Sequence, residues 1–210
     1  MENDTPNKIK ISKEIIATLP IETFPGKIVV IDNERDADNA VLQLNNERII
    51  GFDTETRPTF KKGKSNHVAL IQLSTHDTCY LFRINRIGFT PAIKNLLENE
   101  SLLKVGISLK DDFCMLSRLN GGQFIPKNFI ELQKFVKKYN IEDQSLQKIY
   151  GIVIGKKISK GQRLSNWEAD HLTENQQLYA ATDAWSCIKI YEVLKSGKFK
   201  SPIYKICLLY

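Results

Sequence analysis

An apolar run that ends in two acids constrains the fold of this chain more than any other feature. Residues 49–52 are apolar apart from one glycine, and Asp53-Thr54-Glu55 follow directly. β-Branched and aromatic residues in a short run predict a buried strand. Residues two apart on a strand point to the same side, so Asp53 and Glu55 should project together. Two such carboxylates repel unless a cation lies between them, and Mg²⁺ or Mn²⁺ prefers oxygen ligands of this kind.

A second acidic site lies far downstream, on the helix predicted for residues 174–195. Its apolar residues recur at near-helical spacing, at Leu178, Ala181, Trp185, Ile188 and Val193. Tyr179 and Asp183 are four residues apart, so we expect them on one face of that helix. Spacing alone leaves an alternative open, in which the carboxylate and the phenol cap a neighbour or face water.

An aspartate doublet follows another predicted strand in the middle of the chain. Residues 102–107 read LLKVGI, and a helix with apolar residues at helical spacing is expected to begin at Asp112. Aspartate is a common helix N-cap, so Asp111 could serve a purely structural role there. The pattern by itself does not identify the functional member of the doublet.

These motifs together resemble the three exonuclease motifs of the DEDDy 3′–5′ exonuclease family. That family includes ribonuclease D and the Werner-syndrome exonuclease domain. The likeness covers roughly residues 27–195 and is greatest to the Werner-type branch, in GFDTE, VALIQLSTHDTCYLF, KVGISLKDD, NFIEL, SLQKIYG, SNW and LTENQQLYAATDAW. Spacing from Gly106 in the Werner-like pattern favours Asp112 over Asp111 as the second-motif acid. Residues 120–123 depart from the pattern and indicate a loop variant.

The resemblance implies an activity and roles for these residues. Such enzymes remove nucleotides from a 3′ end as 5′-monophosphates with two metal ions. Asp53, Glu55, Asp112 and Asp183 would hold two Mg²⁺ or Mn²⁺ ions, with Asp53 bridging both. Tyr179 would orient the attacking water, because a free tyrosine pKa near ~10 is too high for an efficient base at neutral pH.

The resemblance favours DNA over RNA as the nucleic-acid partner. The helical accessory domain that commonly follows a ribonuclease D catalytic domain is not expected after residue 195. A ribonuclease D-like enzyme that trims RNA 3′ ends is one alternative. A non-catalytic nucleic-acid-binding module of the same fold is another, although degenerate relatives usually lose an acid and none is missing here.

The arrangement of patterns along the chain indicates an α/β fold. Strands are predicted at 27–32, 48–55, 67–75, 78–84 and 102–107, and helices at 13–18, 36–44, 91–98, 112–119, 131–138, 144–150 and 174–195. Strands early, helices later and one crossover strand predict a mixed central β-sheet flanked by helices. By family likeness this is the ribonuclease H-like exonuclease fold. We divide the chain into a lead-in (1–26), an exonuclease domain (27–196) and a tail (197–210).

Composition narrows the setting in which the protein works. With 210 residues and 42% hydrophobic content, one core is expected. No apolar run reaches the ~18–20 residues of a membrane span, and the polar N-terminus lacks a secretory signal. Four cysteines without CxxC spacing, three of them in predicted core elements, indicate reduced thiols. We therefore expect a cytoplasmic protein.

Basic and aromatic residues suggest how a strand could be held. The net charge is +6, which suits a polyanionic substrate. Two basic clusters flank the motifs, Lys61, Lys62 and Lys64 after the first and Lys156, Lys157, Lys160 and Arg163 before the third. Each is either a solvated loop or a phosphate contact. Trp167 could stack on a base, but we favour an aromatic plug beneath Tyr179. Phe60 and His67 are further stacking candidates.

Overall fold

The computed structural model describes residues 8–58, 67–197 and 199–200. The basic cluster Lys61, Lys62 and Lys64, the stacking candidate Phe60 and most of the predicted tail lie outside the described residues.

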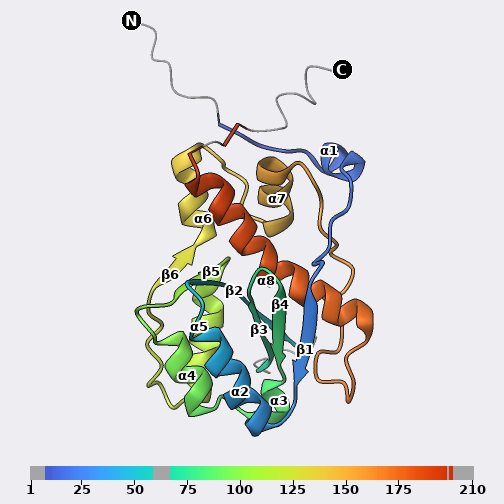
Figure 1. Ribbon diagram of the computed structural model, residues 1–210. Coiled ribbons are helices and arrows are strands. Elements are labelled where there is room, and N and C mark those ends of the chain that lie inside the picture. The colour runs from blue at the N-terminus through green and yellow to red at the C-terminus, as the bar shows by residue number, and fades with distance from the viewer. Residues whose placement is uncertain (1–7, 59–66, 198, 201–210) are drawn as a thin grey trace, which may run out of the picture.

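In the described residues, six strands form one mixed sheet in the order β1-β4-β3-β2-β5-β6 (Figure 1). The strands are β1 (Lys27–Ile31), β2 (Ile49–Thr56), β3 (Val68–Ser74), β4 (Thr78–Phe82), β5 (Leu103–Gly106) and β6 (Phe129–Glu131). β3 pairs antiparallel with β2 and β4, and the other pairs are parallel. The predicted α/β class with a mixed sheet is confirmed. β6 was not predicted, since three residues are too short to show a period.

Helices cover both faces of the sheet. One face packs against α2 (Glu34–Leu44), α3 (Ile84–Ile87), α4 (Pro91–Leu97) and α5 (Leu109–Leu119). The other face packs against α7 (Leu146–Ile154) and α8 (Glu174–Lys195), with α1 (Lys13–Thr18), α6 (Leu132–Phe135) and a 3₁₀ turn (Val136–Tyr139) beyond. Figure 1 shows α8 crossing the sheet diagonally, so one helix touches most of the strands.

Helix α8 is buried on almost every side. The spacing of its apolar residues predicted a single apolar face, but every residue from Tyr179 to Ile188 is buried. The sheet covers one side of the helix and α7 and the lead-in cover the other. A helix surrounded by protein loses its periodic signal, which explains the difference. Thr173 and Gln176 form a capping box at its start.

Several helix boundaries differ from the sequence prediction. α5 begins at Leu109, so the prediction that Asp112 starts this helix is wrong, and neither Asp111 nor Asp112 is its N-cap. Both aspartates lie in the first turn instead. α2 begins at Glu34 because the Asn33 side chain caps it. The helix predicted at 131–138 is divided into α6 and the 3₁₀ turn, α7 extends to Ile154, and α3 was not predicted.

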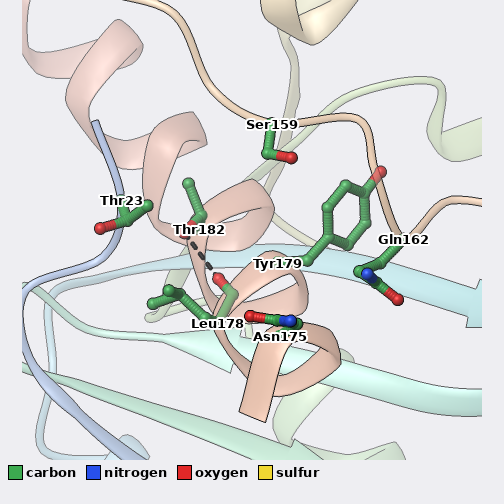
Figure 2. A pocket seen from close by; sticks show the side chains of 7 residues that line it. All are labelled: Thr23, Ser159, Gln162, Asn175, Leu178, Tyr179 and Thr182. Atoms are coloured by element: carbon green, nitrogen blue, oxygen red, sulfur yellow. Dashed lines mark hydrogen bonds between the residues drawn. The ribbon is translucent and has the colours of Figure 1, made fainter. Parts of the chain in front are cut away.

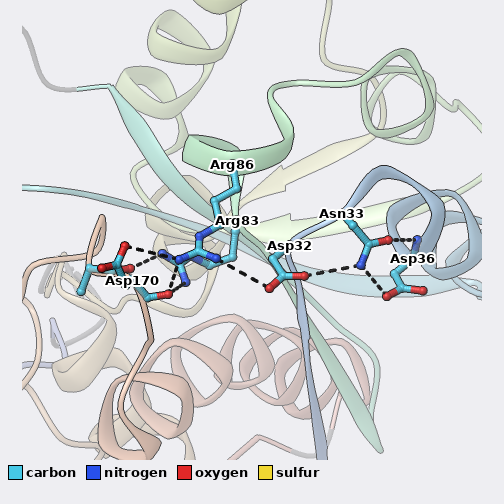
Figure 3. Close-up of polar contacts among 7 residues, drawn as sticks. Asp32, Asn33, Asp36, Arg83, Arg86 and Asp170 are labelled. Atoms are coloured by element: carbon cyan, nitrogen blue, oxygen red, sulfur yellow. Dashed lines mark hydrogen bonds and ion pairs between the residues drawn. The ribbon is translucent and has the colours of Figure 1, made fainter.

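Two arginines anchor the loop that leads into α8 (Figure 3). The Arg83 side chain is buried and donates to the carbonyls of Ala169 and Asp170. Arg86 also donates to the Asp170 carbonyl, and its guanidinium lies 3.8 Å from the Asp32 carboxylate. These bonds tie the end of β4 to the segment just before α8 and so help to place that helix.

The lead-in is attached across α7 and α8. It forms β-bridges from Ile9 to Ile141 and from Ile21 to Lys157. The Glu22 carboxylate accepts from Lys156 at 2.7 Å, from Lys189 at 2.9 Å and from the Tyr150 hydroxyl. Residues 8–26 are therefore part of the packed fold.

Of the three described cysteines, which are all free thiols, two lie in the core. Cys79 and Cys187 are buried, but Cys114 is exposed on α5, so the prediction of a third core cysteine is wrong. The fourth, Cys207, lies outside the described residues. The cytoplasmic location stays a prediction.

Among the helices of the described residues, none combines the length and apolar character needed to cross a bilayer.

Candidate active site

Three carboxylates converge where α8 passes over β2. One oxygen from each of Asp53, Glu55 and Asp183 lies within 4.8 Å of the others. Asp53 and Glu55 alternate on β2 and so face the same side, as predicted. Asp183 comes from the middle of α8. The structure thus brings together side chains that are 130 residues apart in the sequence (183 − 53).

A glycine permits this close approach of helix and strand. A Cβ atom at Gly51 would lie only 1.9 Å from the Ala184 carbonyl oxygen. Gly51 is two residues before Asp53, and Ala184 directly follows Asp183. The absent side chain lets the α8 backbone contact β2, which is what brings the two carboxylates within a few ångströms.

Asp112 approaches from the first turn of α5. The Thr54 hydroxyl donates to its carboxylate at 2.5 Å, and Asp112 lines the same cavity as the other three acids. It is not part of the 4.8 Å group. Asp111 also lines the cavity but is exposed, whereas Asp112 is partly buried. Burial raises the pKa of Asp112 to about 6, although the Thr54 hydrogen bond opposes that rise.

Sequence reasoning missed the side chain that caps α5, the helix that carries Asp112. The N-cap residue of α5, Ser108, makes no capping bond with its side chain. Instead the Glu131 carboxylate, at the end of β6, accepts from the backbone N–H groups of Ser108 at 3.1 Å and Leu109 at 2.8 Å. A cap supplied from 22 residues away leaves no local signal in the sequence.

The cavity beside these acids has a volume of about 350 Å³. Lys160, Arg163 and Tyr179 line it together with the acids. Burial raises the pKa of Asp53, and the charges of Asp183 and Glu55 raise it further. Burial and the neighbouring acids likewise raise the pKa of Glu55, while Arg163 lowers it. The direction of these shifts means that Lys160 and Arg163 do not offset the repulsion among the buried acids.

Tyr179 is held between the acids and a buried tryptophan. Its hydroxyl bonds the Asp183 carboxyl and lowers the pKa of that group, against the larger effect of burial. Burial and the adjacent acids raise the pKa of Tyr179, which keeps the phenol protonated at neutral pH. The rings of Tyr179 and Trp167 are 6.1 Å apart and tilted. Trp167 is fully buried, which confirms its interpretation as an aromatic plug.

The residues of the second basic cluster, 156–163, have two different roles. Lys160 and Arg163 line the acidic cavity. Lys156 pairs with Glu22, and the Lys157 ammonium donates to the Ala17 carbonyl. The phosphate-contact hypothesis therefore applies to Lys160 and Arg163, while Lys156 and Lys157 fasten the lead-in. His67, the other stacking candidate within the described residues, is exposed just before β3.

Residues 28–197 match the family described as 3′-5′ exonuclease. The chain is 36% identical over 203 residues to the mouse bifunctional 3′-5′ exonuclease/ATP-dependent helicase WRN, which covers 90% of this chain and 14% of that protein. It is 28% identical over 192 residues to a 3′-5′ exonuclease of Arabidopsis thaliana, covering 84% and 66% of the two chains. The chain thus spans less than two thirds of the length of either relative.

Solved structures share the fold at lower identity. The Nibbler EXO domain of Aedes aegypti superimposes with a TM-score of 0.72 at 21% identity, covering 97% of this chain and 100% of that one. Ribonuclease D of Escherichia coli gives 0.71 at 21% identity, covering 81% and 46%. The ribonuclease H-like exonuclease fold expected from the motifs is confirmed.

Proposed function

Because this chain belongs to the 3′-5′ exonuclease family, we propose that it hydrolyses phosphodiester bonds from the 3′ end of a nucleic-acid strand and releases nucleoside 5′-monophosphates. The observation that carries the proposal is the convergence of Asp53, Glu55 and Asp183 within 4.8 Å at the floor of a cavity that also holds Lys160 and Arg163. A structural role would not require three mutually repelling carboxylates to be buried together.

The acidic group fits a divalent cation. Its donors are all carboxylate oxygens, and the burial that raises their pKa values also makes a neutralising cation favourable. Asp53, Glu55 and Asp183 would hold Mg²⁺ or Mn²⁺, and Asp112 would support a second ion. Bound there, such ions activate water and stabilise charge on the leaving oxygen.

The chain's own side chains position the reactants. Tyr179 stays protonated, so its hydroxyl can hydrogen-bond an attacking water but cannot take its proton. Lys160 and Arg163, on the rim of the cavity, can bind phosphates of the strand, with the planar Arg163 guanidinium suited to two phosphate oxygens at once.

DNA is the substrate that we favour, on the Werner-like motifs that run through the chain. RNA 3′-end trimming is the alternative. The two differ at the 2′ position, so discrimination depends on contacts that reach that hydroxyl.

A time course on 5′-labelled DNA and RNA, each single- and double-stranded, tests the proposal. With Mg²⁺ or Mn²⁺ we expect ladders that shorten from the 3′ end, and with EDTA none. Asp53→Ala serves as the inactive control. Internal cuts, or the absence of cleavage with both metals, would contradict the proposal, and the preferred polymer follows from the relative rates.

A further inference from the structure

A second cavity lies behind Tyr179 and is not needed to explain bond cleavage. Its volume is about 310 Å³. The walls come from three segments: the lead-in supplies Thr23, the loop after α7 supplies Ser159 and Gln162, and the first turns of α8 supply Asn175, Leu178, Tyr179 and Thr182. Figure 2 shows Thr23 and Gln162 on opposite sides of this cavity, with the Tyr179 ring beside Gln162.

The two cavities share a wall. Ser159 and Tyr179 line both the cavity of Figure 2 and the cavity that contains the acids. A strand whose scissile phosphate lies at Asp53 and Asp183 would therefore have a neighbouring nucleotide within reach of the second cavity. This inference rests on the proposed exonuclease function.

The lining of the second cavity is polar but uncharged. Lys160 and Arg163 line only the acidic cavity, and no charged residue lines this one among the described residues. A phosphate would be matched by lysine or arginine. Amides and hydroxyls beside an aromatic ring and a leucine instead match a neutral planar group with donors and acceptors at its edge.

Several of these polar groups can form further hydrogen bonds. Thr23 and Asn175 are exposed, and within the part of the chain that the structure describes their side chains have no hydrogen-bond partner from the protein. The Gln162 carbonyl oxygen accepts from the Ser165 hydroxyl at 2.6 Å, which fixes the amide and leaves its nitrogen without a partner. In contrast, the Thr182 hydroxyl is fully engaged, since it accepts from the Phe24 N–H and donates to the Leu178 carbonyl.

We propose that this cavity binds an unpaired nucleobase of the strand that is being shortened, one nucleotide or more from the bond that is cut. Asn175 and Gln162 read the edge of the base by hydrogen bonds, and Leu178 contacts its face. The site favours a single-stranded or frayed 3′ end, because a paired base has its edge occupied.

Binding of 5′-fluorescent single strands, followed by anisotropy in EDTA so that no cleavage occurs, tests the proposal. Each strand carries one abasic residue, at the 3′-terminal, penultimate or third position. We expect one of these positions to weaken binding about fivefold or more, as the loss of a buried base does. Equal affinity for the intact strand and all three abasic strands would overturn the inference.

Pairing the abasic strands with variants locates the base. Asn175→Ala and Gln162→Ala should each weaken binding of the intact strand roughly three- to tenfold, the effect of one lost hydrogen bond. One abasic strand is expected to bind the wild type more weakly than the intact strand does. The two variants should bind that abasic strand with the same affinity as the wild type. Variants that weaken both strands equally would show that these side chains act elsewhere, and would overturn the assignment. Asn39→Ala and Gln43→Ala, exposed on α2 and remote from both cavities, are matched controls.

The cleavage assay separates this inference from the proposed function. If the wild-type protein shortens strands while no abasic position matters, only the base site is wrong. If it binds strands with the expected abasic sensitivity yet never cleaves them with Mg²⁺ or Mn²⁺, the base site stands and the exonuclease activity fails. In an active enzyme, Asn175→Ala should raise KM and leave kcat within about twofold.

Discussion

Two sites beside α8 each place carboxyl groups next to a tyrosine, and the pKa values of their carboxyl groups move in opposite directions. At the active site, burial raises the pKa values of Asp53 and Asp183, which lie beside Tyr179. At the lead-in, burial of Glu22 is outweighed by hydrogen bonds from Lys156, Lys189 and Tyr150, which lower its pKa to about 2. The residue types are alike but their neighbours differ, because two ammonium groups contact Glu22 whereas other acids surround Asp53.

The comparison separates a structural carboxylate from one that is available for a ligand. Glu22 already has two ammonium partners at 2.7 and 2.9 Å, so it stabilises the fold and has nothing left to bind. The three acids of the site share only the more distant Lys160 and Arg163, so they retain an unmet demand for positive charge. A divalent cation meets that demand.

The largest expected effect comes from removing an acid of the site. Asp53→Ala or Asp183→Ala should reduce the rate of single-turnover cleavage with Mg²⁺ by at least roughly a thousandfold, since bound metal lowers the barrier by several kcal/mol. The free energy of unfolding in urea without metal should stay the same or rise, because a repulsion is removed. Glu22→Gln should show the reverse, with an unchanged rate and lower stability. Full activity in either alanine variant would refute the site.

The pH dependence of stability should isolate Glu22. Its folded-state pKa of about 2 is below the unfolded value of ~4.3, so its stabilisation is fully present above pH ~4.3 and is lost as the pH falls towards 2. The full shift corresponds to about 3 kcal/mol, which is an upper bound because solvent screens the partly exposed Lys156 and Lys189 ammonium groups. Urea unfolding at pH 7, 5 and 3 should show a smaller decline for Glu22→Gln than for the wild type. Parallel curves would mean that the ion pairs contribute nothing.

The aspartate doublet offers an internal comparison within one helical turn. Asp112→Ala should slow cleavage by up to about a hundredfold, the range found when a group that supports a metal site is lost. Asp111→Ala should stay within about twofold, because an exposed side chain can be replaced by water. The measurement is single-turnover cleavage of a 5′-labelled strand. Equal losses, or a larger loss at Asp111, would reverse our choice of second-motif acid.

The two tyrosines provide the smallest and most specific test. Tyr179→Phe should slow turnover roughly tenfold, the effect of one hydrogen bond to a charged partner, and should leave metal binding intact. Tyr150→Phe removes the corresponding hydroxyl from Glu22 and should cost about 1 kcal/mol of stability without changing the rate. Turnover and metal-dependent thermal shifts measure both effects. Unchanged kinetics for Tyr179→Phe would remove its proposed role.

Much of the fold could be predicted because its strands carry strong local signals. The runs around Ile50, Leu70, Leu81 and Val105 are apolar, short and flanked by turn residues, and each is a buried strand of the sheet. The acids of β2 were expected on one side because a strand has a period of two, and they lie there. The order of the motifs along the chain then predicted that Asp183 lies near the acids of β2, which no local pattern could do.

The features that were missed depend on contacts between distant segments. α5 starts at Leu109 because Glu131 caps it, and a local search for an N-cap finds the aspartates instead. The link from Phe24 to Thr182 joins residues 158 positions apart. Lys156 and Lys160 look equivalent in the sequence, yet one pairs with Glu22 and the other lines the acidic cavity. Only tertiary structure distinguishes them.

The attachment of the lead-in matters to anyone who shortens this protein for expression. A fragment cut at residue 28, where the family match begins, would keep every acid of the site. It would also lose Phe24 from the edge of the Trp185 ring, strip Lys156 and Lys189 of their counter-charge, and open the wall at Thr23. Low activity and low thermal stability of that fragment would result from the loss of the lead-in. They would say little about the chemistry of the intact chain.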